Sequence, residues 1–524
     1  MTLGDLLARA ALRRPDAEAV VDGRRRLTYA ELDARAAAAA RGFARLGVGP
    51  GDRVLLVLRN RLEHVVAYWA LQKLGGVAVP VNFRLAAYEL RYVLEDAGAR
   101  VALFEASTGD AVLEAASGTR TTLVSVGDRV ASRAPGAELF DELLAAVGEP
   151  AGSEPPSEQD LSLILYTSGT TGRPKGVPRT HRNHYAGALA HVIQCGYTWG
   201  ERTLGVMPLY HTMAVRSLLA MALVGGAFVC LPRFEAGQAL ELIAAEAITN
   251  LYLVPTLYHD LLHHPRFATC DVSSVKKLGF AGAPMTDGLL KKLQAAFRPD
   301  LFVNHYGSSE IYTFTIEQNA PAKPGSAGRA GINETVRVMT LGAKSVDELA
   351  AAGEEGEIIA LAASDEAFEG YWRRPDADAK ALRQGWYFTG DTGFVDRDGD
   401  LFVTGRVDDI IITGGENVSP VEIESCLSLH GAVSEVAVVG LPDERWGKII
   451  TAFVKRRSAI EGEELDAFCR ASGLANFKRP RRYVFVAEIP KSPVGKLLRR
   501  KLTAGEYTAE PADAAPAGRG QGAA

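Results

Sequence analysis

A loop rich in hydroxyl groups and glycine is the segment of this chain best suited to bind phosphate. It reads Thr167-Ser168-Gly169-Thr170-Thr171-Gly172, follows an apolar run from Leu163 to Tyr166, and precedes Lys175. Glycines let backbone N–H groups approach an anion, hydroxyls add donors or hold a metal, and a lysine supplies positive charge. It is not a Walker loop, because Gly176 follows the lysine where Ser or Thr should stand. Alone, the loop fits a solvated turn and a phosphate site equally well.

Composition narrows the class of protein before any motif is considered. At 524 residues the chain is long enough for at least two domains, and 47% hydrophobic and 23% charged residues are typical of a globular protein. A net charge of -5 gives no general attraction to nucleic acid or anionic membranes, so we expect neither as a partner. Five scattered cysteines indicate free thiols in a reducing compartment. Without a signal segment or an 18-residue apolar run, we expect a cytoplasmic enzyme.

Short apolar runs alternate with segments of helical spacing, which indicates an α/β fold with parallel strands. Val54 to Leu58 predicts a strand, and Asn60 with Glu63 predicts the cap of a helix that Gly75-Gly76 ends. Residues 148–158 predict a linker, and residues beyond 331 a small β-rich subdomain. The same reasoning predicts a helix over 87–97 and strands over 77–81, 101–104, 122–126, 204–207, 227–231, 250–254, 277–281 and 301–306.

Several motifs, in this order along the chain, resemble the adenylate-forming superfamily of acyl-CoA ligases, peptide-synthetase adenylation domains and luciferases. The most specific is YTSGTTGRPKG at 166–176; further matches lie at 304–310, 385–391, 405–409 and 490–496. The closest resemblance is to benzoate- and 4-chlorobenzoate-type CoA ligases. It implies an N-terminal adenylation domain at 1–405, a hinge at 406–408 and a mobile α+β C-terminal domain at 409–505. We expect 506–524 to be a disordered tail.

The resemblance implies a nucleotide site assembled from four segments. Taken alone, Asp391 would be a turn aspartate and Arg406 a surface cation. In the family's pattern, the loop from Thr167 to Gly172 and Lys175 hold the β- and γ-phosphates, Tyr306, Gly307 and Ser309 contact adenine and the α-phosphate, Asp391 and Arg406 contact ribose, and Thr170 and Glu310 hold Mg²⁺.

The resemblance also implies a reaction in two steps at one site. The C-terminal domain would take a different position for each step. In the first, Lys496 bridges the attacking carboxylate and the α-phosphate. In the second, after rotation about Asp408, the loop Gly414-Gly415-Glu416 lines a tunnel for the thiol arm of CoA.

Two further groups of residues would bind the acceptor and the acid. Aromatic and basic side chains that suit the CoA nucleotide are Trp446, Phe477, Arg479 and Arg481. The expected acyl pocket comprises Ala190, His211, Tyr252, Ala281, His305, Ile311, Tyr312 and Thr313, with His211 as a wall and tunnel gate rather than a general base. This pocket is more polar than the chlorobenzoate pattern, so a ring with a hydroxyl, amine or second carboxylate fits it.

The sequence therefore predicts an ATP-dependent, AMP-forming carboxylate–CoA ligase for an aromatic or alicyclic acid. It would require Mg²⁺ and CoA, carry no tightly bound organic cofactor, and be a monomer or homodimer. Alternatives are a ligase for a short or medium aliphatic acid, an enzyme that loads a carrier protein, and a protein that has lost catalysis. An amino acid substrate is disfavoured, because no aspartate follows His211 to hold its amine.

Overall fold

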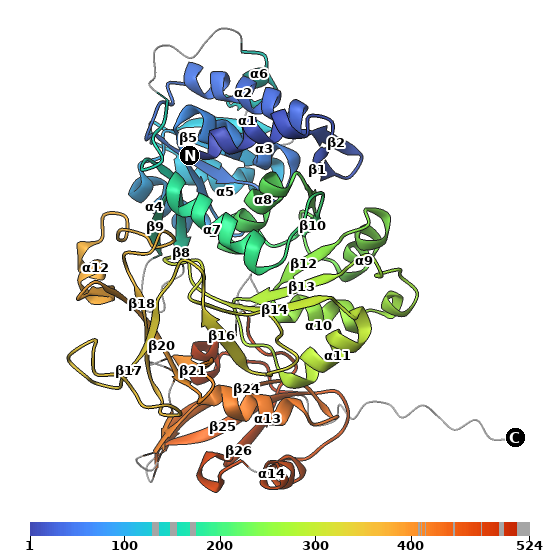
Figure 1. Ribbon diagram of the computed structural model, residues 1–524, viewed down its shortest axis with the longest axis vertical. Coiled ribbons are helices and arrows are strands. Elements are labelled where there is room, and N and C mark those ends of the chain that lie inside the picture. Colours follow the sequence, from blue (N-terminus) through green and yellow to red (C-terminus); the bar gives the residue numbers. More distant parts are fainter. Residues whose placement is uncertain are drawn as a thin grey trace, which may run out of the picture.

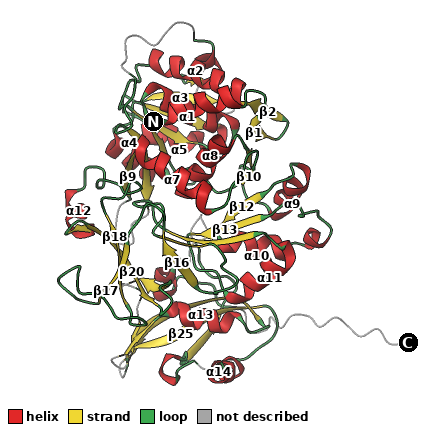
Figure 2. Cartoon of the chain, viewed as in Figure 1, coloured by secondary structure: helices red, strands yellow, loops and turns green. Residues whose placement is uncertain are grey.

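The described residues form four β-sheets with helices packed against them, which confirms the predicted α/β class (Figure 1). The computed structural model describes residues 1–127, 136–146, 155–167, 174–406, 409, 411–413, 416–443, 446–472, 474–491 and 497–510. Figure 2 shows that helices and strands alternate through the N-terminal half, whereas strands prevail in the segment that follows β14.

The first sheet has seven strands and carries the beginning of the predicted phosphate loop. Its order is β7-β6-β5-β3-β4-β8-β9, with parallel pairing throughout except between β8 and β9. The strands are β3 (Arg53–Val57), β4 (Val77–Pro80), β5 (Val101–Glu105), β6 (Thr122–Val126), β7 (Glu138–Leu139), β8 (Leu161–Thr167) and β9 (Lys175–Thr180). Because β8 ends at Thr167 and β9 begins at Lys175, the loop lies at one end of a hairpin. The residues 168–173 themselves lie outside the described part.

The second sheet has 14 strands and changes character along its length. Its central strands, β10 to β14, pair in parallel, and from β15 onward the pairing is antiparallel. The parallel strands are β10 (Arg202–Gly205), β11 (Ala227–Cys230), β12 (Asn250–Leu253), β13 (Lys277–Ala281) and β14 (Leu301–Tyr306), with β1 (Glu18–Asp22) and β2 (Arg25–Thr28) at one edge. The antiparallel part is β15 (Thr315–Glu317), β16 (Ser326–Ala330), β17 (Val336–Thr340), β18 (Gly356–Leu361), β19 (Leu382–Arg383), β20 (Trp386–Val395) and β21 (Leu401–Arg406). It is the β-rich subdomain that the sequence predicts.

Two helices, α3 (Leu62–Leu74) and α8 (Thr212–Val224), are buried on nearly every side. A helix that is apolar all round belongs in an interior. The remaining N-terminal helices are α1 (Leu3–Arg13), α2 (Tyr29–Arg45), α4 (Ala87–Ala97), α5 (Gly109–Ala116), α6 (Phe140–Leu144), α7 (His181–Gln194), α9 (Ala236–Ala245), α10 (Pro255–His263), α11 (Asp287–Phe297) and α12 (Pro375–Ala381). None of the helices described is long and apolar enough to cross a membrane.

Asn60 does not cap α3, contrary to the sequence-based expectation. The residue before the helix is Arg61, and its side chain makes no cap hydrogen bond. Asn60 instead donates to the carbonyl oxygens of Gly205 and Met207, at 2.8 and 2.7 Å, and accepts from the N–H of Leu209 at 2.9 Å. These three bonds join the seven-stranded sheet to the loop after β10. A partner 145 residues away outcompetes the local cap, because a buried amide satisfies several backbone groups at once.

The C-terminal module is a three-stranded sheet, β24-β25-β26, covered by helices (Figure 1). Its elements are β22 (Ile411–Thr413), β23 (Glu416–Val418), α13 (Pro420–Ser428), β24 (Val433–Asp443), β25 (Gly447–Arg456), α14 (Gly462–Ala471), β26 (Arg482–Phe485) and α15 (Arg499–Thr503). Residues 506–510, which belong to the tail expected from the sequence, pack against this module. Tyr507 packs edge-on against Phe453, and Ala509 pairs with Val486. Residues 511–524 lie outside the described part.

The hairpin between β20 and β21 turns through three aspartates that share one lysine. Asp396, Asp398 and Asp400 place carboxylate oxygens within 4.8 Å of one another. The Lys323 ammonium lies among them, 2.6, 3.0 and 2.5 Å from the three carboxylates. This lysine supplies the positive charge that such a cluster requires.

Candidate active site

The residues expected to bind ribose meet where β14 ends beside β20 and β21. Asp391 and Arg406 are directly opposite each other in the β20–β21 pair. The Tyr306 hydroxyl donates to one carboxylate oxygen of Asp391 at 2.6 Å, and Arg406 Nη1 donates to the other at 2.6 Å. Asp391 therefore lies in a strand rather than in a turn, with a donor on each oxygen. A carboxylate oxygen has more than one acceptor position, so each can still accept from a ligand hydroxyl.

The loop after β14 folds back so tightly that it requires glycine at its first position. A Cβ at Gly307 would lie 2.0 Å from the carbonyl oxygen of Tyr312, closer than any side chain tolerates. The N–H of Ser308 donates to the carbonyl of Ile311 at 2.8 Å, which closes the turn. The turn places Ser309 and Glu310 next to the nucleotide residues Tyr306 and Gly307.

Arg179 anchors this loop from β9, and the sequence reasoning missed it. Its Nη1 donates to the carbonyl oxygens of Ser309, at 3.3 Å, and Glu310, at 2.7 Å. The side chain is fully buried, and burial lowers its pKa from the ordinary arginine value. The strand that leaves the predicted phosphate loop thus fixes the predicted metal-binding loop. The only sequence signal was a charged residue within an otherwise weakly polar strand.

Lys175, Tyr371 and Glu310 form a corner that combines the predicted phosphate and metal residues. The Lys175 ammonium lies 3.9 Å from the centroid of the Tyr371 ring. The Tyr371 hydroxyl donates to Glu310 Oε1 at 2.8 Å. Burial lowers the pKa of Lys175, and the charge of Glu310 opposes that shift. Tyr371, which the sequence reasoning did not select, therefore connects two residues that it did.

Most of the expected acyl-pocket residues gather beneath the end of β14. His305 lies opposite Ala281 in the β13–β14 pair, and its ring centroid is 5.8 Å from that of Tyr252. Its Nε2 lies 3.0 Å from the hydroxyl of Thr313. All the expected members except His211 are buried: Ala190, Tyr252, Ala281, His305, Ile311, Tyr312 and Thr313. Ile311 is the exception in position, because it packs with Val177 and Phe314 in a separate cluster under the β-rich subdomain.

An unpredicted arginine from α8 completes this group. Arg216 Nη1 donates to His305 Nε2 at 2.5 Å, and Nη2 donates to the carbonyl of Tyr312 at 2.6 Å. Only 2% of Arg216 is exposed. We call Arg216, His305, His191 and Tyr252 the acyl floor. A cation within the apolar segment from Met213 to Val224 was the sequence signal that could have identified it.

His211 caps α8, half-buried at its N-terminus. Its Nδ1 accepts a hydrogen bond from the N–H of Met213 at 3.3 Å. Because Nδ1 is the acceptor, the neutral ring carries its proton on Nε2. This hydrogen bond fixes the orientation of the ring.

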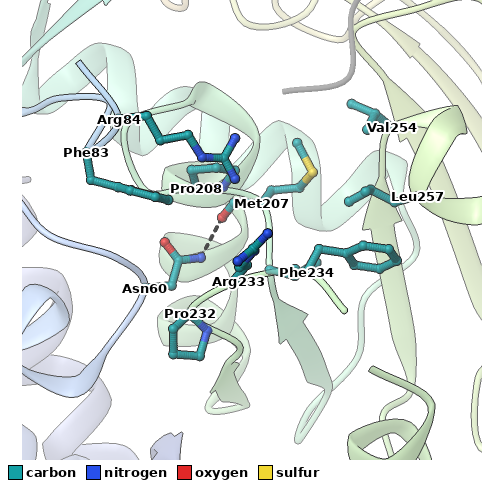
Figure 3. A pocket seen from close by; sticks show the side chains of 11 residues that line it. Asn60, Phe83, Arg84, Met207, Pro208, Pro232, Arg233, Phe234, Val254 and Leu257 are labelled. Carbon is teal, nitrogen blue, oxygen red and sulfur yellow. Dashed lines mark hydrogen bonds between the residues drawn. The ribbon is translucent and has the colours of Figure 1, made fainter. Parts of the chain in front are cut away.

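A small cavity of about 60 Å³ opens at the junction of the two N-terminal sheets (Figure 3). Residues that directly follow β4, β10 and β11 line it, and Figure 3 shows Arg84, Arg233 and Phe83 around the Asn60–Met207 hydrogen bond. None of the expected acyl-pocket residues lines this cavity. Ligands in α/β proteins bind beyond the carboxyl ends of strands, and arginine with phenylalanine suits an anionic, aromatic ligand.

The predicted CoA residues of the C-terminal module divide into two kinds. Trp446 and Phe477 each expose 43% of their surface, and Arg481 is also exposed. Arg479 is buried instead, ion-paired with Asp466 and hydrogen-bonded to Asn476 at 2.9 and 2.6 Å. The predicted residues Ser168 to Gly172, Asp408, Gly414, Gly415 and Lys496, and the side chain of Glu416, lie outside the described part.

Comparison with known proteins agrees with the fold. The family model of the AMP-binding enzyme matches residues 7–372, and that of the AMP-binding enzyme C-terminal domain matches 422–496. The chain is 35% identical to a 4-chlorobenzoate–CoA ligase of Arthrobacter, over 96% of this chain and 94% of the relative. It is 34% identical to a long-chain-fatty-acid–CoA ligase of Mycobacterium tuberculosis, over 91% and 92%.

A solved structure extends this likeness to three dimensions. The crystal structure of a benzoate CoA ligase from Burkholderia xenovorans matches with a TM-score of 0.86 and 26% identity, over 96% of this chain and all of that one. The family model covers well over half of the chain, and both curated relatives match along nearly their whole length. The chain therefore belongs to the AMP-binding enzyme family, and it is an AMP-forming acid–thiol ligase, an acyl-CoA synthetase.

Proposed function

We propose that this ligase activates an aromatic or alicyclic carboxylic acid as its adenylate and then transfers the acyl group to CoA. In the first step, a carboxylate oxygen of the acid attacks the α-phosphorus of ATP, and pyrophosphate leaves. In the second, the CoA thiolate attacks the acyl carbon, and AMP leaves. The observation that carries the nucleotide part is the Asp391 carboxylate, held by Tyr306 and Arg406 at 2.6 Å each.

The nucleotide would lie against this carboxylate, with its phosphates directed toward the corner of Lys175, Tyr371 and Glu310. Lys175 supplies a partly desolvated cation for the β- and γ-phosphates. Glu310 offers a hard oxygen ligand, the kind that Mg²⁺ prefers, on a loop that Gly307 and Arg179 hold in place. A bound Mg²⁺ would neutralise charge on the leaving pyrophosphate, with Thr170 as its second predicted ligand.

The nature of the acid rests on the acyl floor. Planar side chains meet there at short range: the ring centroids of His191 and Tyr252 are 4.7 Å apart, and those of Tyr252 and His305 are 5.8 Å apart. Rings stack or meet edge-on with rings, which favours a cyclic acid. Relatives named for 4-chlorobenzoate and for long-chain fatty acids are almost equally similar to this chain, so likeness alone does not select the acid.

The acceptor is CoA in this proposal, rather than a carrier protein. Exposed Trp446 and Phe477 supply faces for adenine stacking, and Arg481 supplies a cation for phosphate. Arg84 and Arg233 at the cavity of Figure 3 offer a second place for the phosphates or thiol arm of CoA. A carrier protein, the alternative acceptor, would instead need a surface around these residues that is large enough for a protein–protein interface.

Lys496 and Asp408 keep their predicted roles as part of this proposal. Lys496 would serve adenylation only, entering the site through rotation at Asp408, and Gly414 and Gly415 would serve thioester formation. Lys496→Ala should then abolish pyrophosphate exchange but still convert supplied acyl-AMP and CoA to thioester. Equal loss of both half-reactions would contradict the assignment of Lys496 to adenylation alone.

The decisive experiment is a panel of acids assayed for AMP release with ATP, Mg²⁺ and CoA. It should contain benzoates, cyclohexanecarboxylate, and straight-chain acids of four to twelve or so carbons, each also tested with a phosphopantetheinylated carrier protein. We expect the highest kcat/KM with a ring acid and CoA. A straight-chain acid with the highest kcat/KM, or faster loading of the carrier protein, would favour the corresponding alternative.

A further inference from the structure

The buried cation of the acyl floor has no anionic partner in the described part of the chain. Among the residues that the structure describes, no ion pair joins Arg216 to a carboxylate, although only 2% of its surface is exposed. Its hydrogen bonds go to the neutral acceptors His305 and the carbonyl of Tyr312, and its Nε–H has no acceptor at all. A guanidinium cannot lose its proton at ordinary pH, so this charge persists in the interior.

The surrounding titratable groups bring no compensating charge. Burial lowers the pKa of His305 and of His191 well below the usual histidine range, and the charge of Arg216 adds to both shifts. Burial also raises the pKa of the Cys195 thiol to about 12. These three groups are therefore neutral at physiological pH. The ring of Tyr312, 5.0 Å from the guanidinium, offers only its π face.

Two other buried charges lie near Tyr312 and do not cancel Arg216. The guanidinium of Arg179 lies 4.0 Å from the centroid of the Tyr312 ring, and the carboxylate of Glu366 accepts from Asn333 at 3.0 Å. Glu366 forms no ion pair with either arginine among the described residues, and its Oε2 has no hydrogen-bond partner. Among the described residues, neither buried carboxylate near Arg179, Glu366 or Glu310, forms an ion pair with Arg216. An uncompensated buried charge destabilises a fold strongly, so its retention indicates a ligand that supplies the anion.

A second orphaned atom belongs to the same floor. His191 Nε2 is buried without a partner, as is Arg216 Nε. The ligating atoms of His191, Cys195 and His305 lie within 4.8 Å of one another, which brings His191 and His305 together. A metal ion at these three residues is disfavoured, because it would add a second cation beside Arg216 in the interior.

We propose that Arg216, together with His305, forms a subsite for a second carboxylate on the acid substrate, so that the preferred substrate is a dicarboxylic acid activated at one end only. The inference rests on the proposed function and specifies its substrate class. The near carboxylate would be adenylated beside Tyr306 and Gly307, and the far carboxylate would accept from Arg216 as His305 shifts aside. A guanidinium binds a carboxylate through two parallel hydrogen bonds, which gives both charge and direction to the selection.

The test compares acids that are matched in shape but differ in charge. Benzene-1,3- and benzene-1,4-dicarboxylate are assayed against 3- and 4-methylbenzoate, and cyclohexane-1,4-dicarboxylate against 4-methylcyclohexanecarboxylate, by pyrophosphate release. We expect the wild-type enzyme to prefer at least one dicarboxylate over its methyl partner by about 50-fold or more in kcat/KM. Arg216→Met should lower that value for the dicarboxylate by about 100-fold and lower it far less for the methyl acid, so that the preference between the two acids is lost.

Two matched variants separate the subsite from a structural effect. Ser217→Ala changes the neighbouring buried residue of α8, whose hydroxyl bonds only within its own helix, and should leave the preference unchanged. Arg216→Lys keeps the charge but loses the bidentate geometry, so it should retain part of the preference. If Arg216→Met does not fold, the ratio of dicarboxylate to methyl acid in Arg216→Lys, together with binding of the dicarboxylate to the wild-type enzyme by calorimetry, carries the test.

Three results would overturn the subsite: preference of the wild-type enzyme for every methyl acid, an equal loss for both acids in the Arg216 variants, or no measurable binding of any dicarboxylate. In each of these, monocarboxylic ring acids would still release pyrophosphate and the proposed function would stand. Failure of the proposed function differs, because then no ring acid of either group would release pyrophosphate.

Discussion

We call Tyr306, Asp391, Arg406, Glu310 and Tyr371 the nucleotide wall. This wall and the acyl floor meet at β14, where Tyr306 follows His305, yet their charged groups are held in opposite ways. In the nucleotide wall, Asp391 is held by Arg406 and Tyr306, and Glu310 is held by Tyr371. In the acyl floor, no described carboxylate pairs with the buried Arg216, and Arg216 Nε and His191 Nε2 have no hydrogen-bond partner among the described residues. The first region is organised before any ligand binds, whereas the second is incomplete until the acid arrives.

This difference indicates how one protein combines a constant step with a selective one. ATP is the same in every turnover, so a preorganised wall lowers the barrier without having to discriminate. The acid has to be chosen among similar molecules, and unpaired buried groups penalise those that fail to satisfy them. Variants of the wall should therefore harm all acids alike, and variants of the floor should harm acids selectively.

The largest effect should come from removing the carboxylate at the centre of the nucleotide wall. Asp391→Ala removes the ribose acceptor and leaves Tyr306 and Arg406 without their partner, so kcat/KM for ATP should fall roughly 10³-fold. The measurement is ATP–pyrophosphate exchange with several acids. The matched control is Asp398→Ala, an exposed aspartate in the turn after the same strand. A loss of kcat/KM that varies strongly from acid to acid would contradict the expectation that variants of the nucleotide wall affect all acids alike.

A smaller effect, on stability as well as activity, should follow from Gly307→Ala. The new Cβ would meet the carbonyl of Tyr312, which accepts a hydrogen bond from Arg216, so the free energy of unfolding should fall by about 2–3 kcal/mol. Activity should fall with every acid, because the loop carries Ser309 and Glu310. Thermal unfolding provides the readout, and Gly431→Ala, where a Cβ meets nothing within 4 Å, is the control. An unchanged midpoint of thermal unfolding in Gly307→Ala would contradict the close approach of Gly307 to the Tyr312 carbonyl.

Tyr371→Phe should have a moderate effect confined to the metal-dependent step. It removes the hydroxyl that positions Glu310 but keeps the ring over which Lys175 lies, so kcat should fall about tenfold and the Mg²⁺ requirement should rise. Titration of the exchange reaction with Mg²⁺ measures this. Tyr371→Leu, which also removes the ring, should be worse. If Tyr371→Phe behaves like the wild-type enzyme, the hydroxyl has no part in the site, and if the two variants behave identically, the ring has none.

Trp446→Ala should have the smallest effect, and it should alter neither the nucleotide wall nor the acyl floor. Loss of an exposed stacking face should raise the KM for CoA about fivefold while the KM for ATP stays constant. Arg233→Ala, at the cavity of Figure 3, serves as the comparison. A larger rise in Arg233→Ala than in Trp446→Ala would place the CoA phosphates at the cavity instead of on the C-terminal module.

Local patterns predicted the elements of this fold well, and long-range contacts explain where they failed. The helix expected at 87–97 and the strands at 277–281 and 301–306 have the predicted bounds, because apolar spacing and glycine ends act locally. The strand expected at 204–207 ends at Gly205 instead, since the N–H of Val206 turns back to the carbonyl of Leu204. Asn60 gave a wrong cap because its partners are distant in sequence.

The site was predictable only where the residues belong to motifs. Tyr306, Asp391 and Arg406 were selected on that basis, and the structure brings them into one network. Arg216 contacts His305 across 89 residues, Tyr371 contacts Glu310 across 61, and no spacing rule connects such pairs. The roles of Lys496, Asp408 and the residues from Ser168 to Gly172 remain predictions from the sequence.

Because of Lys323, the β20–β21 hairpin needs no metal ion from solution. Three aspartates at alternate positions are the arrangement with which many loops capture calcium, and here a side chain of the same chain provides the cation. Lys323, a residue of the same chain, is therefore the counter-ion for the turn that follows the strand carrying Asp391. Chelators that remove the proposed Mg²⁺ should stop turnover and leave this hairpin folded, so that activity returns when the metal is added back.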